Sequence, residues 1–408
     1  MANKKTLADI PSNLAGDAQQ AGLMRLHLYF VGQTHQRLNA LATEFRAIAM
    51  QHADEEGMLN DLGLLFAQRD MLAAWQTFYR GWQALFEAAR WQAGSLAYGG
   101  LAVLHRGASE LANQQMSESV NQRFSEGVNR QFLEMVEEPD FDAVFRPQLQ
   151  EVLDAANRRL YGDGLTLSQR IWNQDQQSWN GIRATLMQGV AEGNSAWNVA
   201  KQLEQYLGGG RDCPRWTSTR LYARTKQDIA SGDRTGLYSG TACAGQGVAY
   251  NALRLARNEF QVVHHMATDD IFSKMPWVEK EAINLSPSHP DIFCACEDVV
   301  VNGEDGTNVY PKGEISLPIH VQCLCYKTAV LMDDAAFVDK TRGWLNGTQP
   351  WGAMDDYASW LGVMPQNMFA TSLAVGIAND LVVWLWGDEE DLEALLGDQT
   401  VQLPFPED

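Results

Sequence analysis

The chain has 408 residues, of which 45% are hydrophobic and 20% are charged, a balance typical of a folded protein with a full core. Its formal net charge of −20 argues against a protein that wraps nucleic acid, because such binding releases counterions from phosphates onto a Lys- and Arg-rich face. Six cysteines are too few for a secreted disulfide scaffold, and the first residues lack the apolar stretch of a signal peptide. We therefore expect synthesis in a reducing cytoplasm and no membrane span.

The N-terminal region is predicted to be helical from about Ala21 to Arg106. Within it, six apolar residues recur at alternating spacings of four and three, which places them on one helical face. These residues are Met71, Trp75, Phe78, Trp82, Leu85 and Ala89. We interpret this face as the seam of an intramolecular helix bundle, since the heptad pattern is too short for a dimeric coiled coil. Gly99-Gly100 is expected to interrupt the helix, and the polar residues 107–140 form either a solvated helix or a mobile connector.

A second amphipathic helix is predicted to begin after Thr166 or Ser168, both of which are suitable N-cap residues. Its apolar residues are Leu167, Ile171, Trp172, Trp179, Ile182, Leu186 and Val190. The run Gly193-Asn194-Ser195 then ends this helix and starts another one, Trp197–Leu207. Gly208-Gly209-Gly210 follows directly and predicts the end of that helix and a domain boundary.

Beyond this boundary the pattern changes from helical to mixed. Arg215–Ala244 is predicted to be a helix and Phe260–Ala267 a strand. Val299–Val301 and Tyr310–Leu317 are predicted to be short strands or loops. The α+β character is therefore confined to about residues 245–330.

The last region, residues 331–408, combines acidity with tryptophan. It has fourteen Asp and Glu residues against two Lys and Arg residues, hence a net charge of −12, and it contains five tryptophans. Such a segment either docks onto a partner through its aromatic side or packs locally as a helical subdomain. The sequence leaves both interpretations open.

Two short runs share one pattern, in which a histidine is followed by Cys-x-Cys. The residues are His289, Cys294 and Cys296 in the first run and His320, Cys323 and Cys325 in the second. In an extended chain, residues i and i+2 point to the same face, so each Cys-x-Cys offers two thiols side by side. Two such pairs approximate the tetrahedral shell of zinc, with the four cysteines as ligands and the two histidines as supporting partners or substitutes. A closed shell of this kind predicts a structural metal site; reduced thiols and a disulfide are the alternatives.

Other candidate sites carry less weight, and no catalytic residue is predicted. His264-His265 followed by Asp269-Asp270 suggests a hydrolytic metal site, but adjacent residues of a strand face opposite ways and cannot easily serve one ion. Cys213 and Cys243 are expected to be small buried hydrophobic residues. The sequence contains no nucleophile elbow, phosphate-binding loop, HExxH motif or dinucleotide fingerprint.

The second run also resembles the signature of a known family. Pro318, His320, Cys323 and Cys325 are similar to the PxHPxCxC motif that closes the core of phage minor head proteins, the head morphogenesis proteins related to the F protein of phage Mu. Val321 stands where that family usually has proline. The upstream run around His289 looks like the first half of the same module, and the resemblance covers roughly residues 150–330.

Together, these patterns predict a mainly α protein with a small α+β cysteine/histidine module and a helical acidic tail. Four regions are expected: an N-terminal helical region, a helical region with a polar connector, the head-protein core and the tail. Their bounds are 1–110, 111–210, 211–330 and 331–408.

The resemblance implies a structural protein of a tailed-phage virion and not an enzyme. It would lie in the head, at the portal vertex or inner capsid, with the portal protein, the major capsid protein or other head proteins as partners, and would assist head assembly or DNA delivery. Direct binding of nucleic acid is not expected from the net charge. The alternatives are a zinc-dependent hydrolase, an ADP-ribosyltransferase-like phage enzyme, or a subunit of the portal ring.

Overall fold

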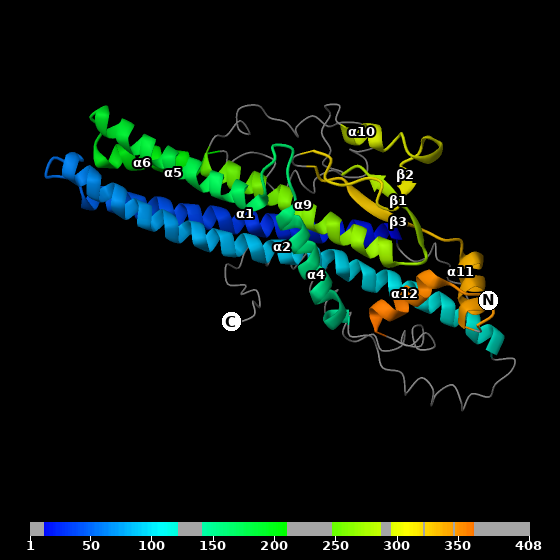
Figure 1. Ribbon diagram of the computed structural model, residues 1–408. Helices are drawn as coiled ribbons and strands as arrows, with labels where there is room; N and C mark the ends of the chain where they lie inside the picture. The colour runs from blue at the N-terminus through cyan, green and yellow to red at the C-terminus, as the bar shows by residue number, and fades with distance from the viewer. Residues whose placement is uncertain are drawn as a thin grey trace.

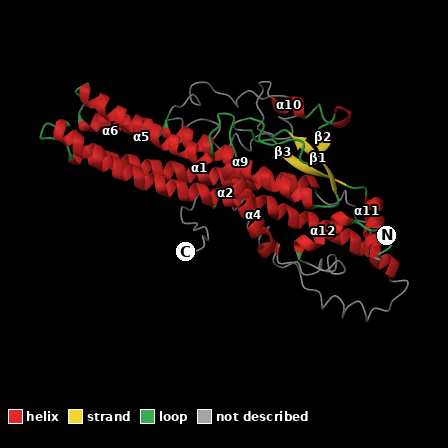
Figure 2. Ribbon diagram, in the orientation of Figure 1, coloured by secondary structure: helices red, strands yellow, loops and turns green. Residues whose placement is uncertain are grey.

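The structure is a computed structural model that describes residues 12–120, 141–209, 247–286, 295–320, 323–345 and 347–362. In these ranges the protein is mainly helical, with one small antiparallel sheet lying against the helices (Figure 2). The predicted fold class, mainly α with a small α+β module, is therefore confirmed.

Two long helices extend along most of the molecule (Figure 1). Helix α1 (Ser12–Gln51) and helix α2 (Asp61–Val120) are an antiparallel hairpin, and the 60 residues of α2 extend for about 90 Å. A shorter hairpin of α5 (Leu167–Ala191) and α6 (Ala196–Leu207) lies alongside one end of it. Helix α9 (Val248–Lys274) continues along the bundle, and α4 (Phe141–Arg158) packs across α2 and α9.

The predicted seam of α2 lies in the larger of two cores. Trp82 stacks on Phe86 with 5.2 Å between the ring centroids, and the ring of Phe30 from α1 meets both edge-on. Five seam residues are buried and Phe78 is partly buried against them: Met71, Trp75, Trp82, Leu85 and Ala89. The prediction of an intramolecular bundle seam is confirmed.

Helix boundaries follow the capping residues. Thr166 caps α5 with a full capping box, since its side chain accepts from the Gln169 amide while the Gln169 side chain accepts from the Thr166 amide. Ser195 caps α6, and Gly208 is its C-cap. Trp172 departs from the predicted buried face of α5, because it is 62% exposed.

The prediction of a break at Gly99-Gly100 is wrong, since α2 runs through both glycines. The neighbouring residues Leu96, Ala97 and Tyr98 are buried, and their packing outweighs the roughly 1 kcal/mol that each glycine costs a helix. Helix α2 also includes residues 107–120, so the helical reading of the polar stretch holds there; residues 121–140 lie outside the described ranges.

The predicted strand Phe260–Ala267 is also wrong, because these residues form the middle of α9. Seven of its eight side chains, both histidines among them, are buried against several neighbouring elements, so the stretch has no exposed polar side that would reveal a helical period. Val299 closes a short helix, α10 (Ala295–Val299), and does not start a strand. The predicted helix Arg215–Ala244 lies outside the described residues.

The sheet contains three strands in the order β2-β1-β3. Strand β1 (Val278–Asn284) pairs antiparallel with β2 (Val309–Pro311) on one side and with β3 (Tyr326–Leu331) on the other. A single 3-10 turn, η4 (Glu304–Gly306), precedes β2. Of the predicted segment Tyr310–Leu317, only its first two residues are in a strand.

The second core joins the sheet to the helices. Here α11 (Asp334–Leu345) and α12 (Gly352–Leu361) pack with the later parts of α2 and α9 around the fully buried Trp277. Trp344, Trp351 and Trp360 belong to this core or pack against it. The described part of the acidic tail therefore packs against α2 and α9 of the same chain, and its docking onto a partner stays a prediction; Trp384 and Trp386 lie outside the described residues.

The larger core combines described residues from the first three predicted regions, 1–110, 111–210 and 211–330. The fourfold division stays a prediction. Across the helices that the structure describes, none combines the length and apolar character needed to cross a membrane.

Candidate metal centre

The second Cys-x-Cys is fixed in place by the residue between its two cysteines. The Leu324 side chain packs against Met24 and Leu28 of α1, and its carbonyl oxygen accepts a hydrogen bond of 2.9 Å from the Gln20 side-chain amide. In an extended segment, a residue that faces α1 sends both neighbours to the opposite side. Cys323 and Cys325 accordingly lie in one cluster, as the sequence predicts.

The third thiol of the cluster comes from the first run. Cys296, on α10, is fully buried and lies with Cys323 and Cys325 in a small apolar cluster closed by Leu285 and Ile319. The sulfur atoms of Cys296 and Cys323 are 3.5 Å apart. Tetrahedral zinc with Zn–S bonds of about 2.3 Å holds two sulfurs about 3.8 Å apart, so this pair already has nearly the required separation.

The imidazole of His320 completes the group. One ring nitrogen of His320 and the sulfurs of Cys296 and Cys323 lie within 4.8 Å of one another, so one ion can reach all three. The backbone contributes to this placement, because the Cys323 amide donates to the His320 carbonyl oxygen at 3.1 Å. In the described part of the chain, this is the one group of three or more such ligands so closely spaced.

Of the six predicted ligands, the structure thus brings together Cys296, Cys323 and His320, with Cys325 beside them. Cys294 and His289 lie outside the described residues, so their part in the site stays a prediction. Thiol and imidazole donors are the ligands that zinc accepts in structural sites, whereas calcium and magnesium require oxygen donors.

Hydrogen bonds among the thiols favour one thiolate in the cluster. Bonds from Cys296 and Cys325 lower the pKa of the Cys323 thiol, and the bond to Cys323 raises the pKa of Cys296. Thiolate is the form of cysteine that binds metal. Cys323 is therefore the sulfur most readily available as the first ligand.

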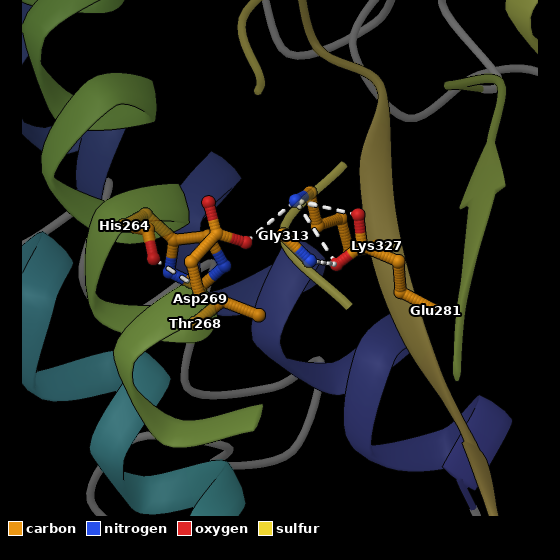
Figure 3. Close-up of polar contacts among 6 residues, drawn as sticks. All are labelled: His264, Thr268, Asp269, Glu281, Gly313 and Lys327. Atoms are coloured by element: carbon orange, nitrogen blue, oxygen red, sulfur yellow. Dashed lines mark hydrogen bonds and ion pairs between the residues drawn. The ribbon is translucent and has the colours of Figure 1, made fainter. Parts of the chain in front are cut away.

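Beside the thiols lies a buried charged cluster that the sequence analysis did not identify (Figure 3). The ammonium group of Lys327 on β3 is 3.0 and 3.1 Å from the two carboxylate oxygens of Glu281 on β1, and both side chains are fully buried. Asp269 of α9 approaches the same ammonium at 2.5 Å, and the Gly313 amide donates to Glu281. Burial raises the pKa of Asp269, although Lys327 opposes this shift.

This cluster attaches the sheet to α9, because Lys327 of β3 pairs with Asp269 of α9. Lys327 lies two residues after Cys325, the last cysteine. The signal for it is the same alternation that pairs the cysteines, because Lys327 has the same phase as Cys323 and Cys325 along the extended chain. A lysine with that phase is directed to the interior, where it requires carboxylate partners.

The two adjacent histidines were predicted to point to opposite faces of a strand, but they lie in the middle of helix α9. His264 and His265 are both buried, with ring centroids 5.4 Å apart, and the His264 Nδ1 lies 3.2 Å from the Ala93 carbonyl oxygen. Burial lowers the pKa of His264 to about 4 and that of His265 to about 3. Asp269 is paired with Lys327, and Asp270 with Lys274 and Tyr98. These carboxylates thus balance lysines and do not join the histidines at one ion.

Comparisons with known proteins add no relative: no protein-family model, no curated protein and no solved structure matches the chain. The geometry of the centre and the sequence motif therefore carry the functional argument.

Proposed function

We propose that this chain is a minor head protein of a tailed phage, and that its cysteine/histidine centre holds one structural zinc ion. The observation that carries the proposal is that the residues of the head-protein signature converge in space. Pro318, His320, Cys323 and Cys325 are close in sequence, but Cys296 comes from a separate run and reaches the same point. A signature whose histidine and cysteines meet Cys296 of the first run at one centre has a structural reason to occur as a unit.

Zinc is the proposed ion because of the donor set. Cys296, Cys323 and His320 can reach one ion, and with Cys325 of the same thiol cluster they would make a Cys3His shell, which is a common structural zinc site. Bound zinc would supply a cross-link between α10 and the loop before β3, in addition to the apolar contacts of Val299 with the cluster that includes Leu317 and Ile319. The three cysteines are buried, which supports a closed shell and a structural role over catalysis.

The arrangement of the rest of the molecule supports protein partners. The net charge of −20 disfavours contact with phosphate, so attachment of this elongated protein to the portal or to other head proteins is better supported than wrapping of DNA. In this proposal the protein lies at the portal vertex or the inner capsid and assists assembly or DNA delivery.

The test of this role is a mass-spectrometric count of the chain in purified virions. The proposal predicts a small and constant number of copies per particle, retained after washing in high salt. Absence from particles, with the chain found only in the infected cell, would contradict it. A copy number equal to that of the portal protein would favour the alternative of a portal-ring subunit.

The ligands of the zinc ion distinguish the structural role from the enzyme alternative. X-ray absorption of the zinc-loaded protein would show sulfur and nitrogen ligands alone if the site is closed. A water oxygen in the shell would favour the zinc-dependent hydrolase, because catalytic zinc keeps an open position for water or substrate.

A further inference from the structure

The end of the bundle farthest from the sheet has an unusual surface (Figure 1). There the loop between α1 and α2 meets the loop between α5 and α6, and the Ala196 amide donates to the Gly57 carbonyl oxygen at 2.9 Å. We refer to residues 50–66 and 187–197 as the bundle tip. Nine large hydrophobic side chains are exposed in the described part of the chain, and six belong to the tip: Met50, Leu62, Leu65, Phe66, Met187 and Trp197.

This concentration differs from the scattered exposed apolar residues of ordinary surfaces. Leu62 and Leu65 are 61% and 60% exposed, and with Phe66 they follow the i, i+3, i+4 spacing of one helical face on the first turns of α2. Trp197 is 44% exposed on the first turn of α6. The exposed groups therefore project from helices and not from loose loops.

The tip is also held in a defined shape. The Asp54 carboxylate accepts from the amides of Glu56 and Met58, at 3.1 and 2.9 Å, and the Asn60 side chain accepts from the Gly63 amide at 2.9 Å. Such a surface is already organised before any partner arrives, which lowers the entropic cost of binding.

The charge of the tip is negative at its extreme end. Its two loops, residues 52–61 and 192–195, contain five carboxylates and no Lys or Arg: Asp54, Glu55, Glu56, Asp61 and Glu192. In the described structure none of the five is in an ion pair. The nearby cations contact groups other than these carboxylates: Arg46 and Lys201 lie over the ring of Trp197, Arg46 also pairs with Glu204, and Arg69 pairs with Asp70.

We propose that the bundle tip is a docking surface for an amphipathic protein segment that presents apolar side chains flanked by Lys or Arg. The apolar groups supply contact area, and the five carboxylates select a basic partner. The same carboxylates disfavour nucleic acid, an anionic membrane and a second copy of this tip, each of which would bring further negative charge. The inference does not rest on the proposed role in a virion.

The test uses the full chain and a synthetic helical peptide with Leu at positions i, i+3, i+4 and i+7 and Lys at the remaining positions. Calorimetry should show binding to the wild-type protein that the variant Leu62→Ser/Leu65→Ser weakens about tenfold. Leu160→Ser is the matched control, since Leu160 is 66% exposed away from the tip and its replacement should leave the affinity unchanged. Glu55→Lys/Glu56→Lys should weaken binding as well, more so at low salt.

Three results would overturn the proposal. One is equal affinity of the wild-type protein and Leu62→Ser/Leu65→Ser for the peptide, with both proteins folded by circular dichroism. Another is equal binding of a control peptide with Glu in place of Lys. The last is binding to phosphatidylcholine vesicles, or self-association in sedimentation velocity, that Leu62→Ser/Leu65→Ser removes, because the surface would then serve a membrane or a second copy.

Discussion

Lys327 is a buried cation whose cost is offset by carboxylates from two different elements. Removing the cation leaves Glu281 buried without its partner, which we expect to cost about 3–5 kcal/mol in Lys327→Ala. The double variant Lys327→Met/Glu281→Leu removes both charges and should lose less stability than the single one. Urea denaturation measures the difference, with exposed Lys201→Ala as the control. A single variant within 1 kcal/mol of wild type would show that water or another cation reaches Glu281.

His105 gives a second prediction for a single residue, one that depends on pH. Its Nδ1 is 2.9 Å from the Tyr357 hydroxyl, and burial lowers its pKa to about 4. As the pH falls below about 6.5, the unfolded chain binds a proton that the folded protein does not, so stability decreases until the pH reaches about 4. Over this window His105 accounts for a loss of roughly 3 kcal/mol.

The variant His105→Gln lacks this titration, so its free energy of unfolding should change less between pH 6.5 and pH 4 than that of wild type. The measurement is urea denaturation of both proteins at several pH values in the window. Equal pH dependence in the two proteins would mean that folding does not lower the pKa of His105.

Among the elements, the α1–α2 hairpin depends on a close approach at Gly63. A Cβ at this position would lie 2.3 Å from the backbone carbonyl oxygen of His52, which cannot rotate away. We expect Gly63→Ala to destabilise the protein by about 1–3 kcal/mol despite its better helix propensity. Gly32→Ala is the matched control, because Gly32 is exposed on α1 with nothing within 4 Å, and it should stabilise by up to about 1 kcal/mol. Equal effects of the two changes in thermal unfolding would contradict the close approach.

The elements also show which parts of the fold could be predicted from the sequence. The amphipathic faces of α2 and α5 alternate with a polar side that reveals the helical period, so both helices could be predicted, although Trp172 of the α5 face is exposed. Of the two N-cap residues considered for α5, Thr166 is the one that caps it. Helix α9 is buried on most of its surface, and its apolar middle looks like a strand when read alone. Gly99-Gly100 looks like a break because the sequence does not show the packing of α1 against it.

The candidate site also has one part that could be predicted from the sequence and another that could not. Local spacing predicts the pairing of Cys323 with Cys325, because the alternation of an extended chain needs no tertiary information. The choice among Cys294, Cys296, His289 and His320 depends on how α10 meets the loop before β3, which spacing does not encode. Glu281 and Asp269 could not be assigned to Lys327 from sequence for the same reason, since they come from β1 and α9.

Considered as a whole, the molecule has two large cores joined by α2 and α9, with the thiol cluster at the side where β3 and Leu324 contact α1. Zinc would therefore stabilise the α10–β3 part more than the bundle. We expect a chelator at neutral pH to increase hydrogen exchange in residues 295–325, while the amides of α1 and α2 keep their protection. Uniform loss of protection along the chain would show that the metal supports the entire fold.

The central claim, a zinc centre built from both Cys-x-Cys runs, is tested most directly by elemental analysis of the purified protein. Wild type should contain close to one zinc per chain. Cys296→Ser and Cys323→Ser should each lose it, whereas Cys213→Ser, outside both runs, should retain it. A wild-type protein without stoichiometric metal, whose stability is the same with and without chelator, would contradict the account.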